Sequence, residues 1–354
     1  MDLTIIKIFI PAIIAFAIGI MITPIVTHFL YKYKVWKKTG GKIALNGQQA
    51  TEFNRLKGSG ETKTPRMGGV IIWGSIFITV IGLYLISLIA NNEMWNQLSF
   101  LSRSQTWIPL ATLLIGAGIG FLNDLYDVTH DGAGIRLRVR LLLIISLAGA
   151  IGWWFYDRLE VSSVNVPLAG PLELGWLIIP FFIILSLAVY ASGVIDGIDG
   201  LSGGVFASIF TAYVGVAFIQ SQYDIAAFNA TLVGAILAFL WFNIPPARFY
   251  MTETGTMALT LTLAVIALMT DTLGDGYGIS MLLIIGAPLV ITVASNIIQV
   301  VYRKRTGKKF FRIAPLHHHF EAIGWPSHKV TMRYWVLSMI CGLLGVVLTA
   351  LLTL

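Results

Sequence analysis

The chain has 354 residues, of which 56% are hydrophobic and only 12% are charged, and its formal net charge is +7. A soluble domain carries about 25% charged residues, so this chain cannot cover a water-facing surface and is predicted to reside in a membrane. Its single cysteine, Cys341, excludes a disulfide framework or a cysteine-based zinc site within one chain.

Ten apolar segments are long enough, or nearly so, to cross a bilayer core, which takes about 20 residues per helix. The first lacks a basic start and is too long for a simple signal peptide, so it is predicted to be a transmembrane helix. The sequence thus predicts an all-α polytopic membrane protein, a single domain over residues 1–354. The predicted helices are Leu3–Leu30, Met67–Ile89, Trp107–Leu122, Leu141–Phe155, Trp176–Ile195, Gly204–Ile219, Ala226–Phe242, Met257–Met269, Ile279–Val301 and Trp335–Leu354.

Basic residues divide the connecting loops into two sets. All 24 Lys and Arg residues except Lys7, Arg103 and Arg158 fall in or beside the set 31–66, 123–140, 196–203, 243–256 and 302–334. By the positive-inside rule this set is cytoplasmic and both termini lie outside. The topology also explains the +7 charge, so no nucleic-acid partner is expected. Among the outer loops, residues 161–171 partly alternate in hydropathy and contain turn residues, which predicts a small hairpin.

The first two cytoplasmic loops contain a proline-glycine segment and a pair of acids. Residues 64–69 (TPRMGG) allow close backbone approach, although the start of a helix explains them equally well. Asp124 and Asp127 lie on one helix face if the helix continues beyond residue 122. Such carboxylates suit Mg²⁺, which takes few protein oxygens; two solvated acids are the alternative. The nearby Arg136, Arg138 and Arg140 could bind a lipid phosphate or anionic headgroups.

The other three cytoplasmic loops carry the remaining polar motifs. Residues 194–204 contain two Asp-Gly pairs in tandem, which suit contact with a metal, a ribose or a base better than a plain turn. Residues 242–256 combine an amide, an aromatic ring and a carboxylate. Residues 315–321 hold three adjacent histidines near several cations, which favours phosphate or nucleotide contact over zinc binding or a solvated run. Together the loops indicate phosphoryl transfer to a lipid at a membrane surface.

The motifs TPRMGG, NDLYD, IDGIDGL, FNIPPARFYMTETGT and APLHHHFEAIGW follow one another between Lys63 and Trp335. In this order they resemble the polyprenyl-phosphate N-acetylhexosamine-1-phosphate transferases, and most of all the phospho-N-acetylmuramoyl-pentapeptide transferase family. The resemblance implies a ten-helix fold in the bacterial inner membrane, usually a homodimer, with a cytoplasmic active-site cleft. It also implies Mg²⁺-dependent transfer of phospho-MurNAc-pentapeptide from UDP to undecaprenyl phosphate, giving lipid I and UMP for peptidoglycan.

By motif position, the resemblance assigns Asp124 and Glu253 to the metal. With Asn123, Asp127 and His318 they form the predicted catalytic set. The uridine side and the substrate phosphates are expected to contact a larger set. These predicted substrate-binding residues are Lys63, Arg66, Arg140, Asp196, Gly197, Ile198, Asp199, Asn243, Tyr250, His317, His318 and His319.

Several positions depart from the family pattern. The motif Asp-Asp-x-x-Lys reads Asn123-Asp124-Leu125-Tyr126-Asp127, so the first aspartate, often proposed as a base, is an amide. A phosphate monoester, with a second pKa of about 6, is already mostly ionised, so a dedicated base is helpful rather than indispensable. Asp127 could take over part of the metal or base role. The metal-binding aspartate is Glu253, the preceding glycine is Thr252, and Glu61 stands where lysine is usual.

Three rival functions remain open at this stage. The same chemistry on another donor, such as UDP-GlcNAc, is supported by Arg66 and opposed by the histidine loop. A catalytically impaired binding or scaffold homologue is supported by Asn123 and Asp127. A secondary transporter should carry its acids near the bilayer midplane, whereas these acids cluster at one predicted membrane face.

Overall fold

The computed structural model describes residues 2–38, 62–90, 92–102, 105–130 and 134–353. The predicted loop 31–66 therefore lies partly outside the described residues, and so do Glu61 and Arg103. The described part contains nine helical stretches long and apolar enough to cross a membrane, or ten if one bent pair counts as a span. The prediction of an all-α polytopic membrane protein with about ten spans is thereby confirmed.

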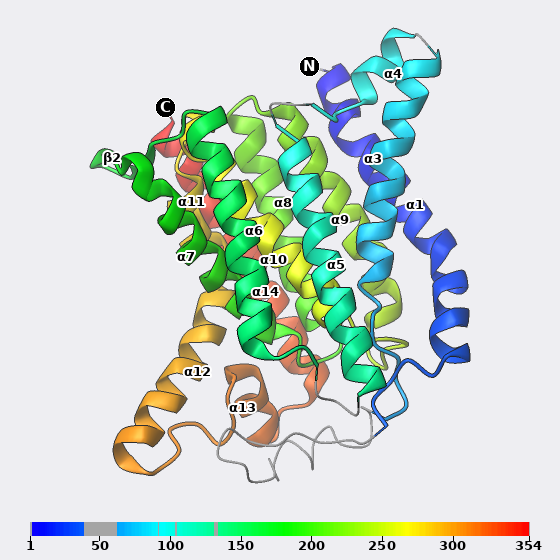
Figure 1. The fold of residues 1–354 in the computed structure, drawn as a ribbon, viewed down its shortest axis with the longest axis vertical. Helices are drawn as coiled ribbons and strands as arrows, with labels where there is room; N and C mark the ends of the chain where they lie inside the picture. The colour runs from blue at the N-terminus through cyan, green and yellow to red at the C-terminus, as the bar shows by residue number, and fades with distance from the viewer. Residues whose placement is uncertain (1, 39–61, 91, 103–104, 131–133, 354) are drawn as a thin grey trace.

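The helices pack as a bundle with two short helices outside it (Figure 1). α7 is flanked by the single turns Gly175–Leu177 and Ser192–Ile195, which extend it to the length of a span. The two short helices are α4 and α13. The helices are α1 Asp2–Lys32, α3 Val70–Ala90, α4 Glu93–Leu98, α5 Trp107–Thr129, α6 Leu137–Arg158, α7 Ile178–Ala191, α8 Leu201–Ile219, α9 Tyr223–Asn243, α10 Thr252–Met269, α11 Gly278–Ile285, α12 Ala287–Thr306, α13 Leu316–Ala322 and α14 Ser327–Leu352.

α10 is the central helix, because nearly all of its residues are buried by the helices around it. α8 and α9 are also largely buried, whereas α1, α6 and α14 leave many large apolar side chains exposed. Ile13, Met21 and Leu343 are each more than 60% exposed, which a water-soluble protein would avoid over so large a surface. The outer helices therefore present the lipid-facing surface.

The predicted helix Ile279–Val301 is not straight. It is divided at Gly286 into α11 and α12, whose axes differ by 71°. Pro288 occupies the first turn of α12, where its missing N–H and its ring do not allow an uninterrupted helix through this point. As a result α12 leaves the bundle and extends beside α13 (Figure 1).

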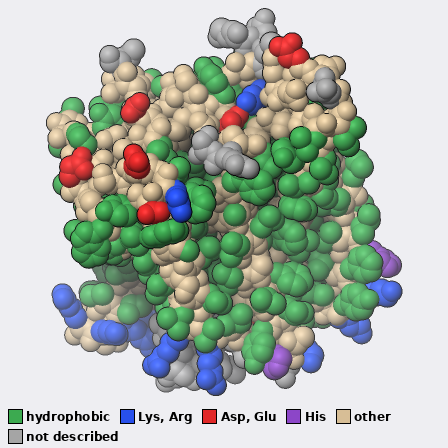
Figure 2. Space-filling model, turned by 45° about the horizontal axis from the view of Figure 1, so that its top comes forward, with side chains coloured by type: hydrophobic (Ala, Val, Ile, Leu, Met, Phe, Trp, Pro, Cys, Tyr) green, Lys and Arg blue, Asp and Glu red, His purple; other side chains and the backbone are tan. Residues whose placement is uncertain are grey.

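The predicted small hairpin is confirmed by the strands β1 Ser163–Val166 and β2 Gly170–Glu173, which pair antiparallel. It lies at the end of the bundle where α1 begins and α14 ends, opposite α13 (Figure 1). Charges segregate along the same direction. Figure 2 shows a broad apolar band with Lys and Arg along one edge and acidic side chains near the other.

Candidate active site

The polar motifs converge because several helices are longer than their apolar segments. α5 continues past Leu122 to Thr129, so Asn123, Asp124 and Asp127 are all helical, and all three are buried. α10 begins at Thr252, five residues before its apolar segment, so Glu253 stands in the first turn. The apolar segments predicted from hydropathy were shorter than these helices, because hydropathy records the polarity of a residue and not its burial against a neighbouring helix.

Asp124 joins α5 to the N-terminus of α10. Its Oδ2 accepts hydrogen bonds from the Thr252 hydroxyl at 2.6 Å, the Thr254 backbone N–H at 2.8 Å and the Thr254 hydroxyl at 2.6 Å. Its Oδ1 accepts one from the Arg66 guanidinium at 3.2 Å. The Asp124 side chain is fully buried, so these donors replace the water that an ionised carboxylate would otherwise require.

Two arginines neutralise the acids of this cluster. Nη2 of Arg66 lies 3.2 Å from a carboxylate oxygen of Asp124 and 3.2 Å from one of Asp127. Nη1 of Arg140 donates to Oε1 of Glu253 at 2.9 Å and to Oδ1 of Asn123 at 3.4 Å. Arg140 can reach them because α6 begins at Leu137, earlier than its apolar segment. These two cations therefore connect the first loop and α6 to the acids of α5 and α10.

The Asp-Gly loop packs against the same helix end. Asp196 accepts hydrogen bonds from the Ser202 hydroxyl at 2.7 Å and from the Thr252 backbone N–H at 2.9 Å. Burial raises the pKa of Asp196 above its ordinary value, and these two hydrogen bonds offset part of that rise. Asp199 accepts from the Ala247 N–H at 3.1 Å. Both aspartates thus hold loop backbone in place.

Asn243 and Tyr250 connect loops through the backbone. The Asn243 amide accepts from the Gly200 N–H at 2.9 Å and donates to the Phe249 carbonyl at 2.8 Å. Gly200 has a φ of +74°, a conformation that glycine adopts without strain. The backbone N–H of Tyr250 donates to the Pro65 carbonyl at 2.8 Å, which ties the fourth loop to the first.

The three histidines do not share one environment. His317 and His318 are buried, and a Cβ placed on Gly197 would lie 2.6 Å and 2.7 Å from their Nε2 atoms. Nδ1 of His318 is 2.7 Å from Oε2 of Glu321. His319 instead accepts the Arg312 N–H at 3.2 Å, and its ring packs on Phe311. Burial, and then the Arg312 charge, lower the pKa of His319 below its ordinary value. The fold brings His317 and His318 to the Asp-Gly loop, while the contacts of His319 lie within its own segment.

Two predicted residues contribute less direct contacts. Lys63 is exposed on the described segment of the first loop, and Ile198 is a buried apolar side chain of the Asp-Gly loop. Neither has a side-chain hydrogen bond to the other predicted residues in the part of the chain that the structure describes. Their assignment to substrate contact stays a prediction.

Sequence reasoning missed the threonines at the start of α10. Thr252 and Thr254 supply three of the four donors on Asp124, and Thr252 has a φ of +55°. The one signal in the sequence was that Thr252 stands where the family pattern has glycine. A residue that replaces an expected glycine is suited to a left-handed conformation only if other contacts hold it there.

The donor set fits Mg²⁺ through Glu253 better than through Asp124. Glu253 is half-buried, and only its Oε1 has a hydrogen-bond partner among the described residues, so Oε2 is available to a cation. Both oxygens of Asp124 already accept hydrogen bonds. Mg²⁺ commonly takes one or two carboxylates and completes its shell with water and phosphate oxygens. In the described ranges, no three His, Cys, Asp or Glu side chains are grouped to hold a metal.

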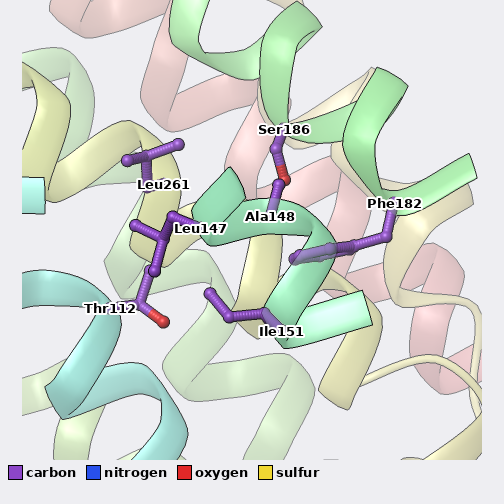
Figure 3. A pocket seen from close by; sticks show the side chains of 7 residues that line it. All are labelled: Thr112, Leu147, Ala148, Ile151, Phe182, Ser186 and Leu261. Atoms are coloured by element: carbon purple, nitrogen blue, oxygen red, sulfur yellow. The ribbon is translucent and has the colours of Figure 1, made fainter. Parts of the chain in front are cut away.

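Two cavities lie away from this cluster. One is a narrow apolar gap between α5, α6, α7 and α10 with no room for water (Figure 3); its lining residues are Thr112, Leu147, Ala148, Ile151, Phe182, Ser186 and Leu261. A larger one, of about 240 Å³, lies beside Trp325 and Tyr334 at the start of α14. Neither is lined by Asp124, Asp196 or Glu253, and the candidate site is defined by its hydrogen-bond network.

Comparison with known proteins gives consistent results. The family model described as glycosyl transferase family 4 matches residues 106–271, which include α5, the Asp-Gly loop and the start of α10. The chain is 34% identical to the phospho-N-acetylmuramoyl-pentapeptide-transferases of Geobacillus sp. (strain WCH70) and Bacillus velezensis, and 31% identical to that of Bacillus subtilis. Each alignment covers 94% of this chain and 95% of the relative.

Proposed function

Because the chain belongs to the phospho-N-acetylmuramoyl-pentapeptide-transferase family, we propose that this multi-pass membrane transferase moves phospho-MurNAc-pentapeptide from UDP to undecaprenyl phosphate. Lipid I and UMP are the products, and peptidoglycan is the end use. The observation that carries the proposal is the similarity over 94% of the chain. The glycosyl transferase family 4 match covers the acids of α5 and Glu253 of α10.

In this reaction an oxygen of the lipid phosphate attacks the sugar-bearing phosphorus of the UDP donor. A new P–O bond forms, the bond to the UMP oxygen breaks, and UMP leaves with the electron pair. The catalytic requirement is mainly positioning and neutralisation of negative charge. Arg66 and Arg140 lie within the acidic cluster, so their charges are available to a diphosphate that displaces part of those ion pairs.

His318 is oriented for phosphate contact. Its Nδ1 faces the carboxylate of Glu321, which in turn accepts the Ser327 hydroxyl, so the ring is fixed from behind. Its Nε2 faces Gly197. Because Nδ1 carries the proton that faces the carboxylate, Nε2 carries one only in the imidazolium form. In that form Nε2–H would donate to a substrate oxygen beside the Asp-Gly loop, where Asp196, Asp199 and Asn243 are proposed to line the uridine side.

Mg²⁺ is proposed as the cofactor, with Glu253 as its carboxylate ligand and Asp124 beside it. When bound, it would offset the charge of the diphosphate and orient its oxygens. Glu253 contributes by keeping one oxygen on Arg140 and presenting the other. Asn123, which also accepts from Arg140, helps to hold that guanidinium in place.

The proposal includes a location and an assembly. The active site would face the cytoplasm of a bacterium from the inner membrane, since Lys and Arg line the edge of the molecule where α13 lies (Figure 1, Figure 2). Both termini would then be outside. A homodimer is proposed by family analogy, and the exposed apolar faces of the peripheral helices could provide its interface.

The test is release of UMP by purified, reconstituted protein. UDP-MurNAc-pentapeptide, undecaprenyl phosphate and Mg²⁺ are supplied, and parallel reactions replace the donor with UDP-GlcNAc or remove the metal with EDTA. We expect release from the MurNAc donor only, abolished by EDTA and by Glu253→Gln. Release from UDP-GlcNAc alone would reassign the substrate, and no release from either donor would leave a binding or scaffold protein.

A further inference from the structure

The N-terminus of α10 is capped by carboxylates from other parts of the chain. A helix leaves its first N–H groups without partners inside the helix, and a Ser, Thr, Asp or Asn just before the helix usually accepts one of them. α10 has Met251 in that position, with no side-chain cap. Instead, the Thr252 N–H donates to Asp196 and the Thr254 N–H donates to Asp124. The two carboxylates also face the positive end of the helix dipole.

Thr252 makes this arrangement specific. Its φ of +55° is an uncommon conformation for a β-branched residue, so it persists only because surrounding contacts hold it. Its hydroxyl donates to Asp124 at 2.6 Å and accepts the Met67 N–H at 3.1 Å. Side chain and backbone together therefore connect α5, the first loop and the Asp-Gly loop to the first turn of α10.

The contacts of Asp124 leave little of it for a metal. Oδ2 of this fully buried carboxylate accepts three hydrogen bonds, from the Thr252 hydroxyl and from the N–H and hydroxyl of Thr254, and Oδ1 accepts one from Arg66. Glu253, the next residue after Thr252, keeps Oε2 without a hydrogen-bond partner among the described residues. The backbone conformation of Thr252 sets the direction in which the Glu253 side chain projects from the helix.

We infer that Thr252 and Asp124 act as a positioning pair: they fix the first turn of α10 so that Glu253 alone contacts the cation directly. The inference rests on the proposed function and deepens it, because Asp124 then acts through α10 and not as the metal ligand that the family resemblance implies. It also accounts for threonine at a position where glycine is expected, since glycine has no side chain to donate to Asp124 and accept the Met67 N–H.

The test compares the variants Thr252→Ser, Thr252→Val, Asp124→Asn and Glu253→Gln. Thr260→Val is the matched control, because it removes another buried hydroxyl of α10 that bonds only to its own helix. Binding of Mn²⁺, used in place of Mg²⁺, is followed by the rise in Tm of the detergent-solubilised protein. UMP release then separates kcat from KM for the donor.

We expect Glu253→Gln to abolish the metal-dependent rise in Tm. Thr252→Val and Asp124→Asn should keep it but need about 10-fold more Mn²⁺, the usual effect of losing a hydrogen bond to a charged group. Both should lower kcat with little change in KM, and the double variant should be no worse than either single one. Thr252→Ser and Thr260→Val should resemble the unaltered protein.

Two results would overturn the inference. One is an Asp124→Asn variant that loses the metal response as completely as Glu253→Gln while Thr252→Val keeps it unchanged, which would make Asp124 a direct ligand. The other is additive loss of Tm in Thr252→Val and Asp124→Asn, which would mean the two residues do not act together. If the unaltered protein shows no metal response, the proposed cofactor is wrong. The Tm losses of Thr252→Val, Asp124→Asn and the double variant then still show whether Thr252 and Asp124 act as a pair.

Discussion

At the scale of single residues, Asn123 is the clearest departure from the family pattern, and its environment tolerates an acid. Its Oδ1 accepts the Ile135 N–H at 3.0 Å and the Arg140 guanidinium at 3.4 Å. Both neighbours are donors, and one is a cation, so an aspartate of the same shape would make the same contacts. An aspartate here would add the base that the family resemblance implies and would be held by the same two donors.

Restoring the acid is therefore expected to help. Asn123→Asp should raise the kcat for UMP release by roughly 10-fold, below the usual range for a general base because the lipid phosphate is already largely ionised. The exposed Asn96→Asp change on α4 serves as the control and should leave kcat unchanged. If neither the unaltered protein nor the Asn123→Asp variant released UMP, the result would support the scaffold interpretation.

At the scale of elements, the approach of α5 to α10 depends on glycines one turn apart. A Cβ on Gly120 would lie 2.1 Å from the Glu253 carbonyl oxygen, and one on Gly116 would lie 3.1 Å from the Met257 carbonyl oxygen. Small residues at this spacing allow two membrane helices to pack with their backbones close together. The close packing brings Asp124 within reach of the first turn of α10.

Gly120→Ala should consequently move the two helices apart. We expect it to lower UMP release by at least about 100-fold, since small misplacements of catalytic groups are costly, and to lower Tm as overpacking does. Gly118→Ala is a matched control on the same helix, because a Cβ there meets no atom within 4 Å. Equal activity of the two variants would show that the close approach is not needed.

At the scale of the whole molecule, the two ends of the bundle are built differently. The site end joins four loops through acids and arginines, and the histidine loop packs on the Asp-Gly loop. The opposite end is closed by the hairpin, where Asp271 accepts the Asn165 N–H of β1 at 2.7 Å and the Ile279 N–H of α11 at 3.0 Å. Burial raises the pKa of Asp271 from 3.8 to about 6, despite these hydrogen bonds.

This pKa gives the stability of the fold a defined pH dependence. The folded protein binds a proton at Asp271 more tightly than the unfolded chain, so the contribution of this group is greatest below pH 3.8 and declines until about pH 6. In Asp271→Asn that titration is absent. The Tm of the unaltered protein minus that of the variant should therefore be larger at pH 5 than at pH 7. A difference that is constant from pH 5 to pH 7 would contradict the prediction.

Much of the architecture was predictable because hydropathy is a local property of the chain. Each apolar segment must satisfy its own backbone hydrogen bonds within the bilayer, so segment lengths alone predicted the spans. The hairpin, likewise, was signalled by adjacent turn residues. The loops with Asp124, Asp196 and His318 could be grouped on one face because the number of spans between them fixes their side.

Tertiary structure decided what depends on partners far apart in the sequence. Asp124 and Thr252 are 128 positions apart, and no pattern within either segment indicates their hydrogen bond. The same holds for His317 and His318 against Gly197, for His319 turned to Arg312, and for the 71° bend that carries α12 out of the bundle. Buried polar groups must find partners wherever the packed helices supply them, and only the packing determines which partners those are.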